Sequence, residues 1–296
     1  MKTLKLYITE ALRVNKNTKG NYHNYHPNTK HELWEIVKKL IKERGNDANL
    51  NDIDVSEITD MTDLFHSSTF NGDISEWNVS NVVNMERMFC HSEFNGDISE
   101  WDVSNVKDIH SMFESSKFNG DISKWDVSKV ENMSYMFYNS KFDGDISEWN
   151  ISNAKDMHSM FAYSKFNGDI SDWDVSKVEN MHGIFGYSNF IGDISKWNVS
   201  KVTNMHKMFV GSKFDGDISK WDVSKVENMS YMFHNTKFNG NISKWNVSSV
   251  VDMSFMFQGS AFNGDISKWN VSNVDSMNNM FEYSPLEKNP PKWYKE

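Results

Sequence analysis

Residues 70–93 read FNGDISEWNVSNVVNMERMFCHSE, and eight further copies of this 24-residue repeat follow without insertion or deletion, ending at residue 285. With Phe70 numbered as position 1, every copy has Gly at position 3 and Trp at position 8. A fixed period of about 20 to 50 residues is typical of stacked repeat proteins, in which each unit packs mainly against its neighbours. The sequence therefore predicts a single elongated repeat domain.

Two incomplete copies flank the nine full ones. Residues 50–69 align with positions 5 to 24 but have Ile53 in place of Trp, and Trp293 falls on the Trp position of a partial copy. We therefore divide the chain into an N-terminal cap (1–49), a repeat domain (50–285, with a degenerate first unit at 50–69) and a partial C-terminal capping repeat (286–296). Within 1–49, Thr29 and Glu32 have the spacing of a capping box, and Gly45 suits a helix end. We expect an amphipathic helix there, over the open end of the stack.

The apolar spacing within one repeat predicts a strand followed by a helix. Positions 5, 8 and 10 have the L-x-x-L-x-L spacing of a leucine-rich-repeat strand, and positions 13, 16, 19 and 20 fit one face of a short helix. The expected fold is thus an α/β solenoid of about ten strand-turn-helix units with a parallel sheet, in which the Trp row points inward. Gly at position 3 is expected to adopt a backbone angle that other residues resist.

Composition excludes several classes of protein. The formal net charge of −10 argues against nucleic acid as the main partner, and the single cysteine, Cys90, excludes an intrachain disulfide framework. The first residues, MKTLKLYITEALRVNKN, are broken by Lys5 and Glu10 and do not look like a secretory signal. No stretch has the apolar length of a membrane span.

The repeat F-N-G-D-I-S-x-W-D-V-S-x-V-x-N-M-x-x-M-F closely resembles that of BspA-type leucine-rich-repeat surface proteins, a repeat also found in mycoplasma lipoprotein-associated proteins. The resemblance covers about 80% of the chain, from Leu50 to the end of the ninth copy. It implies a leucine-rich-repeat-like fold, a role in adhesion or protein binding, display on bacterial surfaces, and no shared catalytic residues. The missing export signal leaves a cytoplasmic or virion-associated location open beside the cell surface.

Three groups of residues have side chains that could bind metals or take part in catalysis. Asp recurs at position 4, where we expect it to accept hydrogen bonds within its own turn, with calcium binding as the less favoured alternative. Histidines at position 17 are expected on a solvated face, too far apart to share a metal. Cys90 has no evident partner, and the recurring serines are assigned to turns and caps. We therefore expect no catalytic, cofactor or metal-binding residues, and no enzyme activity.

The candidate partner-binding residues lie where the repeats differ from one another. The outward position 7 row changes from acidic to basic along the chain, with Lys124 as an exception, and aromatic side chains gather at positions 18, 21 and 22. These patterns predict a non-enzymatic protein-binding or adhesion scaffold, or alternatively a structural component of a surface layer, fibre or phage virion. The partner is expected to be a protein and not a small molecule. The candidate residues are Glu76, Glu100, Glu148, Asp172, Lys196, Lys220, Lys244 and Lys268 on the charged row, and Tyr135, Tyr138, Tyr163, Tyr187, Tyr231 and Phe255 on the aromatic face.

Overall fold

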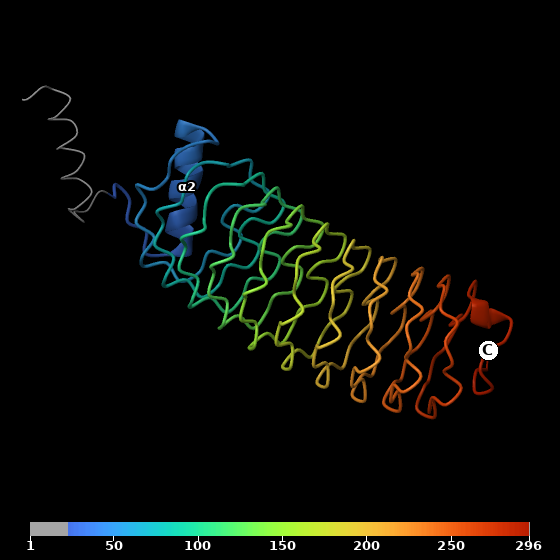
Figure 1. Ribbon diagram of the computed structural model, residues 1–296. Helices are drawn as coiled ribbons and strands as arrows, with labels where there is room; N and C mark the ends of the chain where they lie inside the picture. Colours follow the sequence, from blue (N-terminus) through green and yellow to red (C-terminus); the bar gives the residue numbers. More distant parts are fainter. Residues whose placement is uncertain (1–22, 296) are drawn as a thin grey trace, which may run out of the picture.

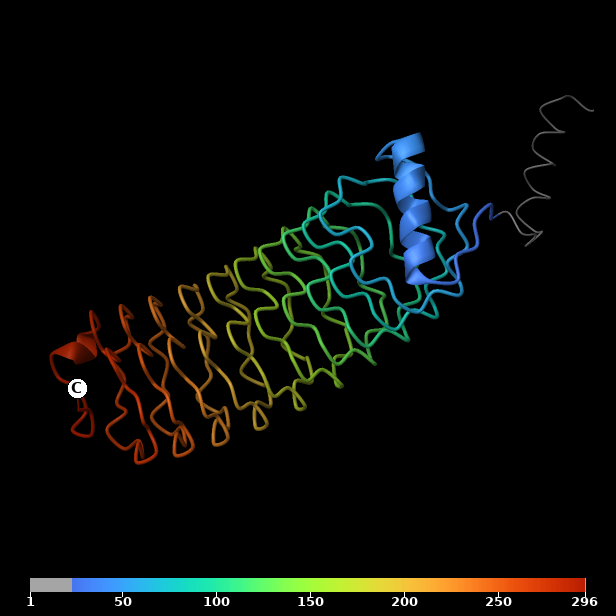
Figure 2. The same ribbon diagram turned by 180° about the vertical axis from the view of Figure 1, so that it is seen from behind.

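The computed structural model describes residues 23–295, and its repeats stack as successive coils along one elongated body (Figure 1). Among these described residues, the helix α2 (Lys30–Arg44) and the 3₁₀ helix η1 (Pro285–Glu287) lie at opposite ends of the stack. Isolated parallel β-bridges, most of them between position 15 of neighbouring coils, connect the repeats. Figure 2 shows the same stack of coils from behind. Residues 1–17, from which we predicted that no export signal is present, lie outside the described residues.

The predicted α/β architecture is wrong. Within residues 23–295 there is no β-sheet, and no repeat contains an α-helix. At positions 5 to 11, where a strand was expected, and on to position 13, the backbone bonds to itself in tight turns. The Trp77 N–H donates to the carbonyl of Ile74 at 3.1 Å, and the Val82 N–H donates to Val79 at 2.9 Å. These donors are therefore not available to a neighbouring strand.

A helix was expected over positions 13 to 20, but from position 16 onward the backbone forms overlapping three-residue turns, such as Met88 N–H to the Met85 carbonyl at 3.2 Å, and also bonds to the next coil. N–H groups at positions 16, 18, 20 and 22 donate to carbonyls at positions 15, 17, 19 and 21 of the following coil. Arg87 N, for example, lies 2.8 Å from the His110 carbonyl oxygen. Residues at positions 18 and 22 have positive φ, such as 54° at Arg87, which a right-handed helix does not allow. The helix-like spacing of Met and Phe is thus produced by overlapping turns.

Short polar side chains form the corners of each coil. At positions 4, 9 and 15 an Asp or Asn oxygen accepts the backbone N–H two residues later. In one coil these bonds are Ser123 N to Asp121 (2.9 Å), Ser128 N to Asp126 (3.0 Å) and Ser134 N to Asn132 (3.1 Å). Such local bonds compete with strand and helix formation. The role predicted for the position 4 Asp residues, as acceptors within their own turns, is confirmed.

The core is a continuous stack of aromatic and aliphatic side chains. The Trp row is buried as predicted; Trp173 is only 4% exposed. Its indole N–H donates to the carbonyl of Ile146 in the preceding coil at 3.1 Å, and the same bond recurs along the row. The Phe side chains at position 20 stack on one another, as do those at position 1, with ring centroids 5.7 Å apart for Phe89 and Phe113. Packing therefore ties every coil to its neighbours.

Gly at position 3 is required by a contact and not by its backbone angle, which corrects our expectation. Among the glycines with positive φ there is none from position 3. A Cβ atom added to Gly168 would lie 2.8 Å from the ring of Phe166, two residues earlier. The same contact occurs at the other copies, so the Phe ring at position 1 fills the space that a side chain at position 3 needs.

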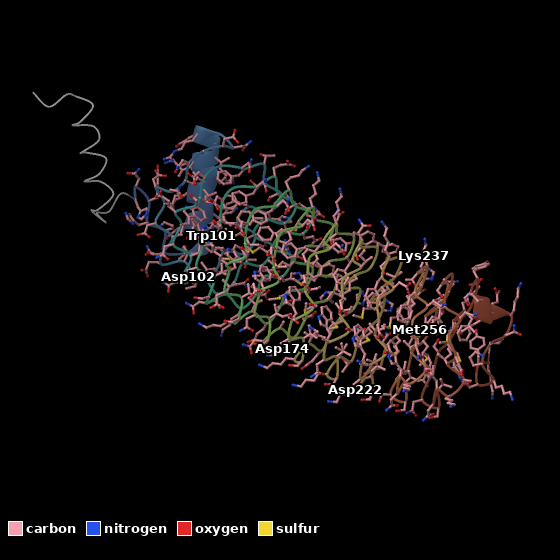
Figure 3. The ribbon with its side chains drawn as sticks, in the orientation of Figure 1. Trp101, Asp102, Asp174, Asp222, Lys237 and Met256 are labelled. Atoms are coloured by element: carbon pink, nitrogen blue, oxygen red, sulfur yellow. The ribbon has the colours of Figure 1, made fainter. Side chains whose placement is uncertain are left out.

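Helix α2 packs against the first coils, as the capping box and apolar pattern predicted. Leu33, Val37 and Leu40 are buried in the common core, and the Thr29 hydroxyl accepts the Glu32 N–H at 3.2 Å. Glu32 itself bonds to the N–H of Asn28. At the other end Trp293 continues the Trp row: its indole N–H donates to Ile266 at 2.9 Å. In Figure 3 the position 9 residues Asp102, Asp174 and Asp222 follow one edge of the stack, while Lys237 lies on the opposite edge.

Candidate functional site

The side chains at positions 17, 18, 21 and 22 of successive coils form one surface, which we call the turn face. These positions belong to the overlapping turns that bond coil to coil, and they carry residues of many kinds, whereas the buried positions repeat almost unchanged. The residues at positions 18 and 22 adopt left-handed backbone angles even where they are bulky, as at Tyr135 (56°) and Phe255 (59°). Such angles cost about 1 to 2 kcal/mol for an L-residue other than glycine. The coil-to-coil bonds impose this geometry and aim these side chains away from the core.

Four of the predicted aromatic residues form a continuous cluster on the turn face. Tyr135 and Tyr138 have ring centroids 5.4 Å apart, Tyr138 and Tyr163 also 5.4 Å, and Tyr163 stacks on Tyr187 at 4.7 Å. Tyr163 and Tyr187 remain 49% and 47% exposed. The structure thus brings together side chains from three successive coils. The first and last of them, Tyr135 and Tyr187, are 52 residues apart in the sequence.

Small residues next to these tyrosines leave a groove. A hollow of about 270 Å³ is lined by the four tyrosines together with Gly183 and Gly186. It adjoins a second hollow of about 480 Å³, which Tyr135 and Tyr138 also line. A groove lined by aromatic rings suits an inserted apolar side chain, and His182 and Lys207 on the same lining can make polar contacts.

Tyr231 and Phe255, the other two predicted aromatics, form a second cluster. Their rings stack at 4.5 Å, and Lys207 lies over the Tyr231 ring at 5.4 Å. Both side chains are half-buried. The structure therefore separates the six aromatic candidates into two groups on the same face.

The histidines at position 17 are half-buried and partnered, which corrects the expectation of a plainly solvated row. His206 bonds through Nδ1 to the Ser230 hydroxyl at 2.6 Å, and His158 lies 2.7 Å from Asp156. His182 stands between His158 and His206, with ring centroids at 6.2 and 4.7 Å. Burial, followed by the charges of His206 and His158, lowers the pKa of His182 to about 4.

The charged row at position 7 is exposed and lies outside the turn face. Some of its charges pair between neighbouring coils: Lys124 Nζ lies 3.5 Å from Glu100, and Lys196 Nζ lies 2.9 Å from Asp172. Exposed pairs of this kind contribute little to stability. They do reduce the net charge that the middle of the row offers to a partner.

Asp side chains at position 4 form a further exposed row beside the charged one. The backbone N–H and the hydroxyl of Ser171 lower the pKa of Asp169, and the same pair of bonds acts on its counterparts in other coils. Each carboxylate is therefore held ionised by its own turn.

The repeats of this chain match one known protein family. A family model described as Mycoplasma protein of unknown function, DUF285, matches residues 35–141, 91–191, 115–211 and 186–293, which together span nearly all of the described chain. The chain belongs to the DUF285 family. No curated protein and no solved structure shows significant similarity to it. Within residues 23–295 of this DUF285 protein, no helix has the length and apolar character needed to cross a membrane.

Sequence reasoning missed a basic row beside the turn face. Position 24 follows the turn face by two residues, is exposed throughout, and carries Lys in five coils. The signal was present, since the repeat alignment puts these lysines in one column. They are Lys117, Lys141, Lys165, Lys213 and Lys237.

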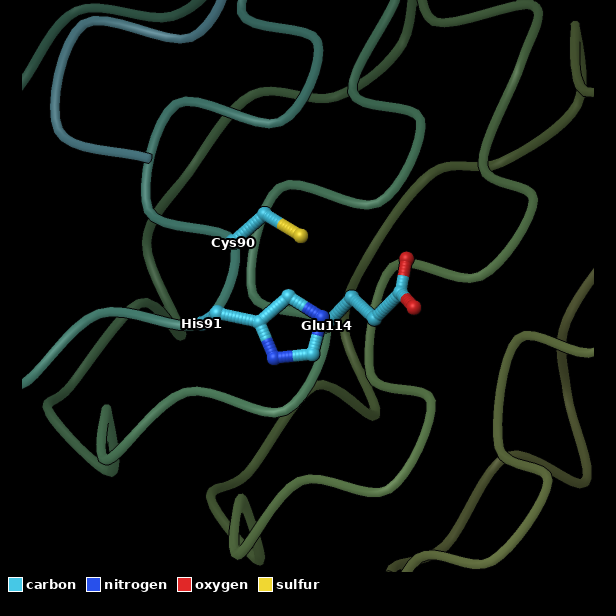
Figure 4. A group of neighbouring side chains, drawn as sticks. All are labelled: Cys90, His91 and Glu114. Atoms are coloured by element: carbon cyan, nitrogen blue, oxygen red, sulfur yellow. The ribbon is translucent and has the colours of Figure 1, made fainter. Parts of the chain in front are cut away.

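Sequence reasoning also gave Cys90 no partner, yet it lies beside His91 and Glu114 on the turn face (Figure 4). The possible ligand atoms of the three residues lie within 4.8 Å of one another. Burial and the Glu114 carboxylate raise the pKa of the Cys90 thiol to about 12. The spacing offered a clue, because Glu114 is one repeat after Cys90 and therefore stacks on it.

Proposed function

We propose that this chain is a non-enzymatic scaffold that binds a protein partner through its turn face. The observation that carries the proposal is the tyrosine cluster, in which Tyr163 and Tyr187 stack while about half of each side chain stays exposed above a groove. The buried side chains are the ones that stabilise the coil. The exposed tyrosines are not needed for folding, which favours a role in binding. Tyrosine is enriched among the residues that dominate protein interfaces.

The chemistry of the face indicates the kind of partner. The groove offers aromatic rings together with the positively charged Lys207, and the Lys row at position 24 lies two residues beyond the turn face in each coil. A protein segment with apolar or aromatic side chains flanked by acidic residues would meet both features. Because the coils repeat at a constant spacing, an extended segment could contact several of them in succession.

The proposal that the chain is not an enzyme is supported by the burial of Ser111, a serine whose hydroxyl lies beside a histidine. Ser111, whose hydroxyl lies 3.3 Å from His110 Nε2, is only 1% exposed. The other ring nitrogen of His110 bonds to Ser134 at 2.6 Å. A nucleophile must reach its substrate, and a side chain this buried does not.

Adhesion, a second candidate face and an alternative function are also proposed from the sequence and the structure. The resemblance to BspA-type surface proteins supports adhesion, and with it a location at a bacterial surface. The charged row at position 7 is the second candidate face, weakened by its ion pairs between coils. The alternative function, a component of a layer, fibre or virion, would require self-association.

A comparison of two variant proteins tests the proposal. The double variant Tyr163→Ser and Tyr187→Ser removes the cluster, and Ser is tolerated at position 22 because Ser115 occupies it in another coil with φ of 52°. The matched control reverses Lys196, Lys220, Lys244 and Lys268 to Glu. Immobilised wild-type protein and both variants are used to capture partners from bacterial and host-cell lysates.

A partner that the wild type and the charge variant retain, and that the tyrosine variant loses, would support the turn face. For such a purified partner we expect each tyrosine to contribute about 2 kcal/mol, or about 30-fold in Kd. Binding lost with the charge variant and kept with the tyrosine variant would move the site to position 7. Sedimentation velocity tests the alternative function: concentration-dependent assembly of the wild type would favour a structural component over a scaffold.

A further inference from the structure

The first full repeat places Cys90, the one cysteine of the chain, on the turn face. Cys90 occupies position 21 and His91 position 22 of one coil, and Glu114 occupies position 21 of the next. The donor atoms of the three side chains lie within 4.8 Å of one another, and Figure 4 shows the Cys90 sulfur pointing toward the Glu114 carboxylate. No other group of three His, Cys, Asp or Glu side chains within residues 23–295 comes together in this way.

We propose that Cys90, His91 and Glu114 bind a zinc ion. A thiolate, an imidazole and a carboxylate are the three ligand types that Zn²⁺ uses in proteins, and sulfur with nitrogen disfavours Mg²⁺ and Ca²⁺. The thiolate and carboxylate together carry two negative charges, which match the charge of the ion. This inference does not depend on the proposed function, although the ion would lie on the same face.

The backbone already holds the ligands in register. The His91 N–H donates to the Glu114 carbonyl at 2.8 Å, so the two coils are tied at the residues that supply the ligands. Ligand atoms around a tetrahedral zinc stand about 3.4 Å apart, given bond lengths of about 2.0 to 2.3 Å. Rotation of the exposed His91 ring and the half-buried Glu114 side chain can close the gap without moving the backbone.

The surroundings give the ion access and a fourth coordination position. All three residues line the hollow of about 480 Å³ that adjoins the tyrosine groove, so water can complete the coordination. His66 lines the same hollow, and its ring lies 6.0 Å from that of His91. The Nδ1 atom of His66 is buried without a hydrogen-bond partner. This nitrogen lies 4.0 Å from the Asp63 carboxylate, so His66 is a further imidazole on the same hollow.

One positively charged side chain, Arg87, faces the site. Arg87 lines the hollow, but its guanidinium lies 2.8 Å from Asp63 Oδ1, which compensates its charge. Binding replaces the thiol proton of Cys90 with the metal: the S–H bond breaks, a sulfur–zinc bond forms, and the proton passes to solvent. No oxidant or other reactant is needed.

The wild-type protein alone provides the first test. Cobalt(II) is added to the full-length reduced chain as a spectroscopic substitute for zinc, and zinc binding is measured by calorimetry. We expect one ion per chain, a thiolate-to-cobalt charge-transfer band, and loss of that band when zinc is added. Absence of the charge-transfer band would overturn the proposal, whatever the variants do.

Variants then identify the ligands. Cys90→Ser and Glu114→Gln should each weaken zinc binding by at least about 10-fold, since removing even a group that only orients a ligand costs about 10- to 100-fold. His206→Asn, on the same face but several coils away, is the control and should keep the wild-type affinity. A smaller loss in the first two variants, or an equal loss in the control, would show that other histidines bind the metal. Thermal unfolding of each metal-free variant checks that it is folded.

Discussion

Replacing Trp173 by Ala in the middle of the stack should remove a large part of the stability of the repeat domain. The side chain is 4% exposed, packs against Phe161 with ring centroids 6.1 Å apart, and donates its indole N–H to Ile146. Burial of such a ring and the cavity left behind together correspond to about 3 to 5 kcal/mol. The Ile146 carbonyl keeps a second donor, the Trp149 N–H at 3.2 Å, so it is not left unpaired.

A second variant separates the contribution of the indole hydrogen bond from that of apolar packing in the stability lost by Trp173→Ala. Trp173→Phe keeps most of the apolar contact but lacks the indole N–H, and should lose about 1 to 2 kcal/mol, roughly one hydrogen bond plus a small change in packing. Asp172→Ala changes the exposed neighbour and serves as the control, with an expected change within about 0.5 kcal/mol. Urea-induced unfolding followed by tryptophan fluorescence measures all three, because the chain has 11 tryptophans. A loss below about 1 kcal/mol for Trp173→Ala would refute the buried Trp row.

Three further predictions concern the turns and the histidines. Gly211→Ala should lower the free energy of unfolding by about 1 to 2 kcal/mol, because φ is +60° at this residue and the added Cβ would lie 2.5 Å from the Tyr187 ring. Thermal unfolding measures this, and a midpoint equal to that of the wild type would contradict the prediction. His182 has its pKa lowered from 6.5 to about 4 by burial, so the folded state favours the neutral form, and its contribution is complete above pH 6.5 and lost as pH falls toward 4. Stability should therefore fall less steeply for His182→Asn than for wild type between these pH values, and parallel curves would argue against the effect. Asn204→Ala removes the acceptor for the His206 N–H and should cost about 1 kcal/mol. Asn204→Asp keeps an acceptor oxygen, and its neighbours at this position are the uncharged Asn180 and Asn228, so it should cost less; equal losses in urea unfolding would show that the turn bond is unimportant.

The repeat and its inward side chains were determined by the sequence alone. The period of 24 residues requires every coil to be nearly identical, and apolar residues at fixed positions require those side chains to be buried. Helix α2 was also predictable, because Thr29, the apolar face and Gly45 act within one short segment. In each case the deciding interactions are local or repeat at the period of the chain.

The course of the backbone between the buried positions was decided only by the tertiary structure. Apolar spacing at positions 5, 8 and 10, or at 16, 19 and 20, specifies which side chains point inward, and turns satisfy it as well as a strand or a helix does. What distinguishes them is where the N–H groups donate, and this depends on carbonyls 23 residues away, as for Arg87 and His110. The left-handed residues at positions 18 and 22 result from those bonds between coils.

The candidate sites divide in the same way. The sequence identified the variable positions and their aromatic residues, but only the stacking of coils brings Tyr163 against Tyr187 and Glu114 beside Cys90. Side chains one repeat apart become neighbours because each coil bonds directly to the next. Sequence composition determined what this face carries, and coil-to-coil hydrogen bonding determined which of those side chains meet.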